Sequence, residues 1–219
     1  MTKLNTILFD LDGTLIDTNE IIIMSFEATF KKHFPKVAVS REEILTYIGP
    51  TLQQTFGKYT NSPFMILDMI KSYREFYVDF EIGNFEIYPN VLEVIKDLHS
   101  KSYNIAIVTS KFKVAAWPSF THYELDKYIK TFISLDDVKN PKPNEEPVLL
   151  ALSKFDNVTK AIMIGDNQGD ILSGKNAGIF SAGVAWSIKG EKHLKEVNPD
   201  FILKDINDIY SIIEEVEVM

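Results

Sequence analysis

Two aspartates, Asp10 and Asp12, stand two positions apart in the segment DLDGT at residues 10–14. On extended chain, side chains two positions apart point to the same side. A pair of carboxylates placed in this way suits a hard cation that prefers oxygen ligands, with one carboxylate as nucleophile and the other as acid/base. Gly13 permits a sharp turn after them. We expect Gly13 and Thr14 to contribute to substrate binding.

This segment has two alternative interpretations, a plain turn and a calcium-binding loop. Asp and Gly are common turn formers, so the segment could be a plain turn. A calcium-binding loop is excluded, because such a loop has Asp or Asn at its fifth position and Gly at its sixth. This chain has Thr14 and Leu15 there.

A second polar group, Thr109-Ser110-Lys111, follows the apolar run at residues 105–108. A hydroxyl at a strand end, together with neighbouring backbone amides, can hold a phosphate oxygen. Taken alone, these residues are more typical of a helix cap. As part of a site, they are candidates for binding the phosphate of a substrate.

A third candidate, Lys142, stands between two prolines that restrict its backbone. A lysine fixed in this way can balance the charge of a phosphoryl group and of nearby aspartates. Taken alone, it is better explained as a surface lysine. Asp166 follows the apolar run 161–164, and Asp170 lies one helical turn further on. Both are candidate ligands of the cation held by Asp10, although Asp166 could simply cap a helix.

The elements that position these residues are short buried strands. Strands are expected at residues 4–9, 105–109, 132–135, 161–164 and 179–184, with a weaker sixth at 201–203. Helical patterns such as 91–98 and 148–155 alternate with them. This alternation predicts an α/β fold with a doubly wound, parallel-sheet (Rossmann-like) core. Such a sheet builds its site at the carboxyl ends of its strands, where most of the candidates fall.

One stretch, from about 16 to 83, is helical almost throughout and interrupts the alternation directly after the first strand. It predicts an inserted small α-helical cap domain at 16–83, with the core formed by 1–15 and 84–219. Residues 81–84 are expected to be the return linker. An insertion beside the carboxyl end of a strand is well placed to act as a lid.

Composition narrows the classes of function. The formal net charge of −8 argues against nucleic-acid binding, because no basic stripe is present. The absence of cysteine excludes disulfides, thiolate nucleophiles and thiolate metal sites. The first apolar run is too short for a signal peptide or a membrane span, so we expect a soluble cytoplasmic protein. No coiled coil stands out, which weakly favours a monomer.

This set of motifs, in this order, resembles the haloacid dehalogenase-like hydrolase superfamily over the whole chain. The resemblance implies Mg2+ as cofactor, Asp10 as nucleophile on phosphorus and Asp12 as acid/base. It implies that Thr109 and Lys142 hold the phosphoryl oxygens. The cation would be bound by Asp10, the backbone carbonyl of Asp12 and Asp166, with Asp170 as a direct ligand or a support.

A narrower resemblance connects the chain to one subgroup of that superfamily, which contains HPr-associated bacterial inorganic pyrophosphatases and phosphoglycolate phosphatase-like relatives. It is carried by the segments FDLDGTLI at 9–16, IGP at 48–50, LDDV at 135–138, EPVLLAL at 146–152 and GVAW at 183–186. The resemblance implies pyrophosphate as the substrate. Gly49, in the cap, is a plausible point of close approach to the substrate.

One departure from the superfamily pattern concerns Pro118, which falls where its members have an uninterrupted helix. We expect it to break or kink that helix. The functional alternatives are a phosphatase for phosphoglycolate or a sugar phosphate, a phosphomutase of the same fold, and a non-catalytic binding protein. The nucleophile and acid/base pair argues against the last of these.

Overall fold

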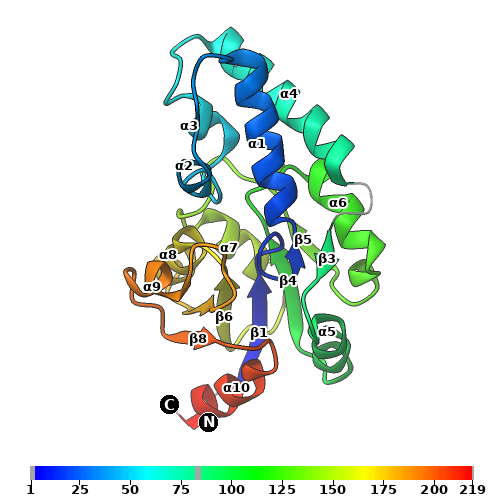
Figure 1. The fold of residues 1–219 in the computed structure, drawn as a ribbon. Helices are drawn as coiled ribbons and strands as arrows, with labels where there is room; N and C mark the ends of the chain where they lie inside the picture. Colours follow the sequence, from blue (N-terminus) through cyan, green and yellow to red (C-terminus); the bar gives the residue numbers. More distant parts are fainter. Residues whose placement is uncertain (1–2, 82–84, 219) are drawn as a thin grey trace. The chain divides into compact units, whose positions relative to one another are not determined.

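The computed structural model describes residues 3–81 and 85–218. Its largest element is a six-stranded sheet in the order β5-β4-β1-β6-β7-β8, in which neighbouring strands run parallel (Figure 1). The order reverses between β1 and β6, so the predicted doubly wound α/β fold is confirmed. The strands are β1 (Leu4–Phe9), β4 (Asn104–Val108), β5 (Thr131–Ile133), β6 (Lys160–Gly165), β7 (Phe180–Val184) and β8 (Phe201–Leu203).

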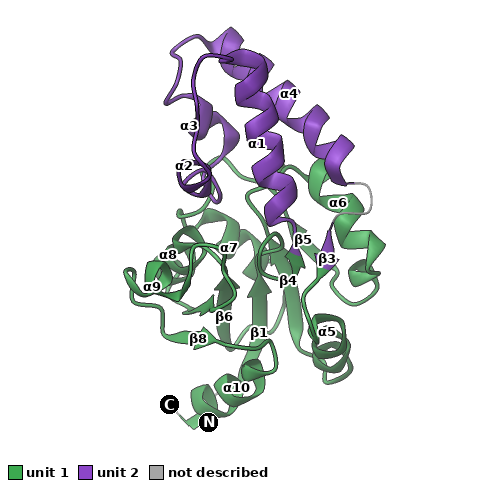
Figure 2. Cartoon of the chain, viewed as in Figure 1, with its two compact units in different colours: residues 1–16, 87–219 green, residues 17–86 purple. Residues whose placement is uncertain are grey.

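The chain divides into two compact units, coloured separately in Figure 2. Unit 1 comprises residues 1–16 and 87–219, and unit 2 comprises 17–86. The cap was expected at 16–83. The expected return linker at 81–84 lies largely outside the described residues, which omit 82–84. Two short strands at the unit boundaries, β2 (Ile16–Asp17) and β3 (Glu86–Ile87), pair with each other in a separate sheet.

The centre of unit 1 is an apolar core, because the middle strands of its sheet carry apolar side chains on both faces. Ile7, Leu8 and Phe9 of β1 are fully buried, as are Ile162 and Met163 of β6. Successive side chains on a strand point to opposite faces, so one run of apolar residues supplies two layers of core. The helices of unit 1 are α5 (Val91–Ser100), α6 (Lys113–His122), α7 (Glu146–Leu152), α8 (Gln168–Asn176), α9 (Glu191–Lys195) and α10 (Asp208–Val218).

Helix α7 shows how these helices are held against the sheet. Its Val148 and Ala151 are fully buried in one apolar cluster with Leu8 of β1 and Met163 of β6. Helix α10 contacts β1 and β8, and α5 contacts β4. Helix α10 lies beside the end of β1 where that strand begins (Figure 1). The opposite ends of the strands are therefore left for a site.

Three expectations for unit 1 need correction. Helix α6 continues through Pro118 to His122, so the predicted break is absent, while the alternative of a kink stays a prediction. Packing explains this: Trp117 and Phe120 both contact the ring of Phe132, at 5.5 and 4.9 Å between centroids. These contacts hold the helix against β5 on both sides of Pro118, which itself donates no backbone hydrogen bond.

The third predicted strand ends earlier than expected, at Ile133. Ser134 and Asp137 form a reciprocal capping box there, so Leu135 begins a 3-10 turn, η2 (Leu135–Asp137), in place of continuing the strand. The predicted helix at 148–155 instead spans Glu146–Leu152.

The described residues of unit 2 form four helices: α1 (Asn19–His33), α2 (Arg41–Leu45), α3 (Leu52–Phe56) and α4 (Pro63–Glu81). Helices α1 and α4 pack against each other. Aromatic rings fill the space between the elements. Phe26 contacts Tyr73 at 4.7 Å and Tyr47 at 5.3 Å between ring centroids. Such aromatic pairs add to the apolar burial that holds the unit together. No helix among the described residues is long and apolar enough to cross a membrane.

Candidate active site

The loop after β1 carries Asp10 and Asp12 at the carboxyl edge of the sheet. The backbone N–H of Asp10 donates to the carbonyl of Ile164 in β6 at 2.9 Å, which places the two strand ends side by side. Gly13 has a φ of 79°, in the left-handed region that favours glycine. A Cβ at Gly13 would stand 2.5 Å from Asp166 Oδ2. Glycine is therefore required at position 13 both by the positive φ of the turn and by the close approach of Asp166.

Lys142 reaches into this cluster from the loop before α7. Its Nζ lies 2.7 Å from Asp10 Oδ1 and 2.5 Å from Asp170 Oδ1, and it donates to the carbonyl of Val108 at 2.8 Å. Its side chain is only 5% exposed. The neighbouring aspartates raise the pKa of Lys142 although burial alone would lower it. The lysine therefore stays charged and cross-links the ends of β1, β4 and α8.

Three buried carboxylates lie together at this point. Asp10, Asp166 and Asp170 each bring one oxygen into a group whose members are all within 4.8 Å of one another. Burial raises the pKa of Asp10 to about 7; Lys142 opposes this effect, while Asp170 and Asp12 add to it. Burial also raises the pKa of Asp166, and the charges of Asp10 and Asp170 act in the same direction. The cluster thus holds more negative charge than one lysine offsets.

Asp166 and Asp170 differ in what holds them. Asp170 Oδ2 accepts from the N–H of Asn167 at 2.9 Å, and its Oδ1 pairs with Lys142. Both of its oxygens therefore have protein partners. Asp166 Oδ2 is buried and has no hydrogen-bond partner. A buried carboxylate oxygen without a donor is costly, so a bound cation at this position fits the donor set.

The charge of the site also fits a divalent cation. Asp10, Asp12, Asp166 and Asp170 face Lys111 and Lys142, which leaves an excess of two negative charges when all are ionised. All the candidate side-chain ligands are carboxylates, which hard cations such as Mg2+ prefer.

The residues after β4 lie beside the same cluster. The N–H of Thr109 donates to the carbonyl of Ile133 at 2.9 Å, and Thr109 is 5% exposed. Its Oγ1 accepts from the N–H of Lys111 at 3.1 Å, and Ser110 between them is half-buried. Lys111 Nζ lies 3.1 Å from Asp12 Oδ1. Lys111, which follows β4, therefore contacts Asp12, which follows β1.

Two of the expected substrate-binding residues, Thr14 and Gly49, can be described from their own local structure. Thr14 is fully buried, its hydroxyl has no hydrogen-bond partner, and its carbonyl accepts from Trp186 Nε1 at 3.3 Å. Gly49 belongs to unit 2, in the loop between α2 and α3, with a φ of 104°. Its positive φ explains the glycine through backbone conformation, and its role toward substrate stays a prediction.

Sequence reasoning missed the residues that follow β7. Ser187 Oγ donates to the carbonyl of Asp166 at 2.7 Å, and Ser187 is buried. Lys189 Nζ lies 3.4 Å from Asn167 Oδ1, and its charge lowers the pKa of Asp166 against the stronger effect of burial. Their position in the sequence could have indicated them, because they follow the fifth predicted strand and so lie at the same edge of the sheet.

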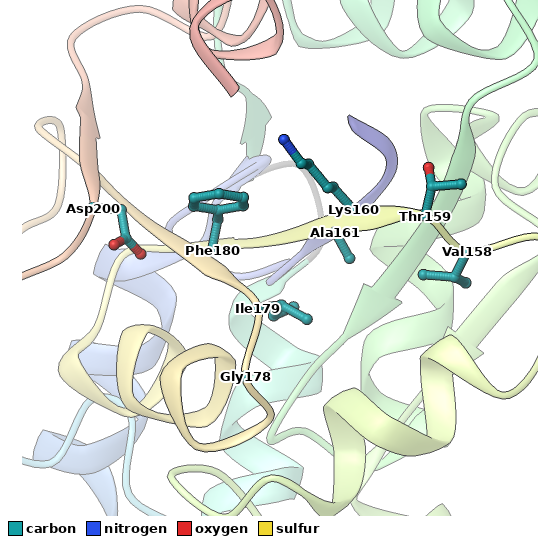
Figure 3. A pocket seen from close by; sticks show the side chains of 8 residues that line it. All are labelled: Val158, Thr159, Lys160, Ala161, Gly178, Ile179, Phe180 and Asp200. Carbon is teal, nitrogen blue, oxygen red and sulfur yellow. The ribbon is translucent and has the colours of Figure 1, made fainter. Parts of the chain in front are cut away.

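A hollow of about 330 Å3 lies at the other end of β6 and β7. Figure 3 shows Lys160 and Phe180 on the two neighbouring strands that border it. Its charged groups are engaged in the fold: Lys160 Nζ donates to the carbonyl of Val216, and Asp200 accepts from the N–H and hydroxyl of Ser181. None of the candidate site residues lines it, so it is separate from the carboxylate cluster.

Comparisons with known proteins identify the family of the chain. Residues 7–184 match the family model for haloacid dehalogenase-like hydrolases. Pyrophosphatase PpaX of Bacillus pumilus is 44% identical over 97% of both chains. Pyrophosphatase PpaX of a Listeria monocytogenes strain is 42% identical over 98% of this chain and 99% of its own.

A solved structure shows the same fold. The crystal structure of a haloacid dehalogenase-like hydrolase from Bacteroides fragilis superposes with a TM-score of 0.86 at 21% identity, over 94% of this chain and all of its own. The family model and the sequence relatives both cover most of the chain. The chain therefore belongs to the haloacid dehalogenase-like hydrolase family, and it is an enzyme that hydrolyses phosphoric anhydrides or phosphate esters.

Proposed function

We propose that this enzyme hydrolyses inorganic pyrophosphate to phosphate with Mg2+, through an aspartyl phosphate formed on Asp10. The observation that carries the chemistry is the buried group of Asp10, Asp166 and Lys142 at one edge of the sheet, with Asp12 next to it. The choice of pyrophosphate is supported by the names of relatives that are 42% and 44% identical over nearly the whole chain.

In the first step, a carboxylate oxygen of Asp10 attacks phosphorus. A bond forms between that oxygen and phosphorus, and the bond from phosphorus to the bridging oxygen breaks. Asp12 gives its proton to the departing phosphate. Lys142 keeps Asp10 in place through its 2.7 Å contact and offsets the charge of the transferred group. Thr109, held against β5, offers its hydroxyl to a phosphoryl oxygen.

In the second step, water attacks the phosphorus of the aspartyl phosphate. Asp12, now deprotonated, takes a proton from that water, and the bond between Asp10 and phosphorus breaks. The nucleophile is thereby restored and phosphate leaves. A single carboxylate serves both steps because it gives a proton in one and takes a proton in the other.

The cation would be held by Asp10, Asp166 and the backbone carbonyl of Asp12. Asp170 supports them by fixing Lys142 and the N–H of Asn167. Bound Mg2+ offsets the charge of the phosphoryl group and orients it. The partnerless oxygen of Asp166 is the feature of this chain that favours such a ligand.

Unit 2 is proposed to be the cap domain that selects the substrate, with Gly49 as its point of close approach. Its helices carry a compact aromatic core of their own, so it can act as one body. The substrate is a small phosphorylated molecule, and a monomer is the expected form.

The test is phosphate release by the purified protein from pyrophosphate, phosphoglycolate and a sugar phosphate, each with and without Mg2+. Strong Mg2+-dependent preference for pyrophosphate is expected. Asp10→Asn, which changes one atom of the nucleophile, should fold but release no phosphate, and radiolabelled pyrophosphate should leave no label on it. Preference for a phosphomonoester would withdraw pyrophosphate as substrate. Dependence on a sugar bisphosphate would identify a mutase.

A further inference from the structure

The site contains two lysines that stand beside different reacting groups. Lys142 Nζ contacts Asp10 Oδ1 at 2.7 Å, whereas Lys111 Nζ contacts Asp12 Oδ1 at 3.1 Å. In the proposed reaction, Asp10 receives the transferred phosphoryl group, and Asp12 protonates the leaving group. A cation in contact with Asp12 is therefore next to the leaving group, while Lys142 is next to the group that is transferred.

The backbone of Lys111 is fixed on both sides of the residue. Its N–H donates to Thr109 Oγ1 at 3.1 Å, and its carbonyl accepts from the N–H of Leu135 at 3.0 Å. The ammonium group therefore projects from an anchored position. A group that is already positioned loses little freedom when it binds an anion.

The two lysines also differ in exposure. The Lys111 side chain is 16% exposed and that of its partner Asp12 is 14% exposed, whereas the Lys142 side chain is 5% exposed. Lys142 is enclosed by its carboxylates and cannot leave them without cost. Lys111 is held by a partly exposed pair, which is weaker and can be exchanged for a phosphate oxygen.

We infer that Lys111 binds the leaving phosphate of pyrophosphate and makes the site selective for substrates whose leaving group is itself a phosphate. This inference rests on the proposed function. A phosphate leaving group offers an ammonium several charged oxygens. The alcohol released from a simple phosphomonoester carries no such charge. Lys111 should therefore contribute far more to pyrophosphate hydrolysis than to monoester hydrolysis.

The experiment compares three substrates with Lys111→Met, Lys111→Arg and the wild type. Pyrophosphate has a charged leaving group. The leaving group of p-nitrophenyl phosphate departs without a proton from Asp12, as an anion whose single charge is delocalised over the ring, and that of methyl phosphate is uncharged but requires a proton. Lys113→Met is the matched control, because Lys113 is exposed and its Nζ lies over the ring of Trp117 at 4.8 Å.

In Lys111→Met, kcat/KM for pyrophosphate should fall by about 10- to 100-fold, the effect expected from the loss of a hydrogen bond to a charged group. The kcat/KM for each monoester should change by less than about threefold, because Lys111 loses no hydrogen bond to a phosphate leaving group there. Methylenediphosphonate, which cannot be hydrolysed, should inhibit the variant more weakly by a similar factor. Lys111→Arg should keep most of the preference for pyrophosphate, and Lys113→Met should change nothing. The ratio between substrates within one preparation is unaffected by partial misfolding.

Two results would overturn the inference. An equal loss on all three substrates would show that Lys111 supports the site as a whole. A loss that is greatest on methyl phosphate would show that it acts only through the proton of Asp12. A different result bears on the proposed function alone: wild-type enzyme that prefers a monoester to pyrophosphate would refute pyrophosphate as its substrate before any variant is compared.

Discussion

Replacing Lys142 with methionine removes the positive charge from the buried cluster while keeping a side chain of similar length. The lysine Nζ stands 2.7 Å from Asp10 Oδ1 and 2.5 Å from Asp170 Oδ1, and its side chain is 5% exposed. Breaking a buried ion pair by removing one partner costs about 3–5 kcal/mol, because the other charge stays buried and uncompensated. We therefore expect the metal-free variant to lose about 3–5 kcal/mol of unfolding free energy at pH 8.

The loss of unfolding free energy in Lys142→Met should grow as pH rises. Asp10 has a folded-state pKa of about 7 in the presence of Lys142. A carboxyl group whose pKa is raised by folding contributes stability that is full below its unfolded pKa and is lost as pH rises to the folded pKa. In the wild type this loss ends near pH 7. Without Lys142 the pKa of Asp10 rises further, and the loss continues above that pH at about 1.4 kcal/mol per pH unit.

The assay is urea unfolding in EDTA at pH 6 and pH 8, followed by tryptophan fluorescence. Both tryptophans, Trp117 and Trp186, belong to unit 1, so the signal reports the unit that contains Lys142. Lys101→Met is the control, since Lys101 forms an exposed pair with Asp97 and lies outside the cluster. The control should show a small change that does not grow with pH. A Lys142→Met loss below about 1 kcal/mol at both pH values would refute the reasoning, because it would equal that of a surface pair.

Three further predictions concern the turn and the cation. Gly13→Ala should destabilise the protein by about 1–2 kcal/mol and reduce its activity, because the new Cβ would meet Asp166 Oδ2 and the φ of residue 13 is 79°. Urea unfolding and phosphate release measure the two effects. Unchanged stability would contradict this account of the turn. Asp166→Asn should raise the stability of the metal-free protein at pH 8, since a crowded buried charge is removed. It should also weaken Mg2+ binding in calorimetry by more than about 10- to 100-fold, the effect of an outer-shell change; tight binding would refute its role as a ligand. Finally, the rise in melting temperature on adding Mg2+ should be larger at pH 8 than at pH 6, because protons compete for Asp10 and Asp166, whose pKa values are raised; a rise independent of pH would contradict this.

The parts of the site that could be predicted from sequence are those set by the ends of strands. Asp10, Thr109 and Asp166 each follow an apolar run, and the carboxyl ends of parallel strands share one edge. The contact of Lys111 with Asp12 could not be predicted, because it depends on side-chain conformation. Ser187 was missed because its hydroxyl acts through the backbone carbonyl of Asp166, a contact without a sequence motif.

The parts of the fold that sequence rules misplaced are those where two local effects compete. The proline rule predicted a break or a kink at Pro118, but helix α6 is not broken there, where the rings of Phe120 and Trp117 contact Phe132. The apolar character of Leu135 favoured a longer strand. Ser134 instead begins a capped turn, because its hydroxyl pairs with Asp137 Oδ2 at 2.7 Å.

The central place of β1 in the sheet has a consequence for how the chain is made. This strand leaves the ribosome before the rest of its sheet, because its two neighbours, β4 and β6, begin only at Asn104 and Lys160. Until β6 has been synthesised, an apolar strand keeps an unpaired edge, which is a hazard for aggregation. All four helices of unit 2 lie in the contiguous stretch 17–86 and need no later residue to meet one another. We therefore expect nascent chains that stop before residue 160 to hold a formed unit 2 and an incomplete sheet, so that the sheet of unit 1 is completed only after β6, β7 and β8 have been made.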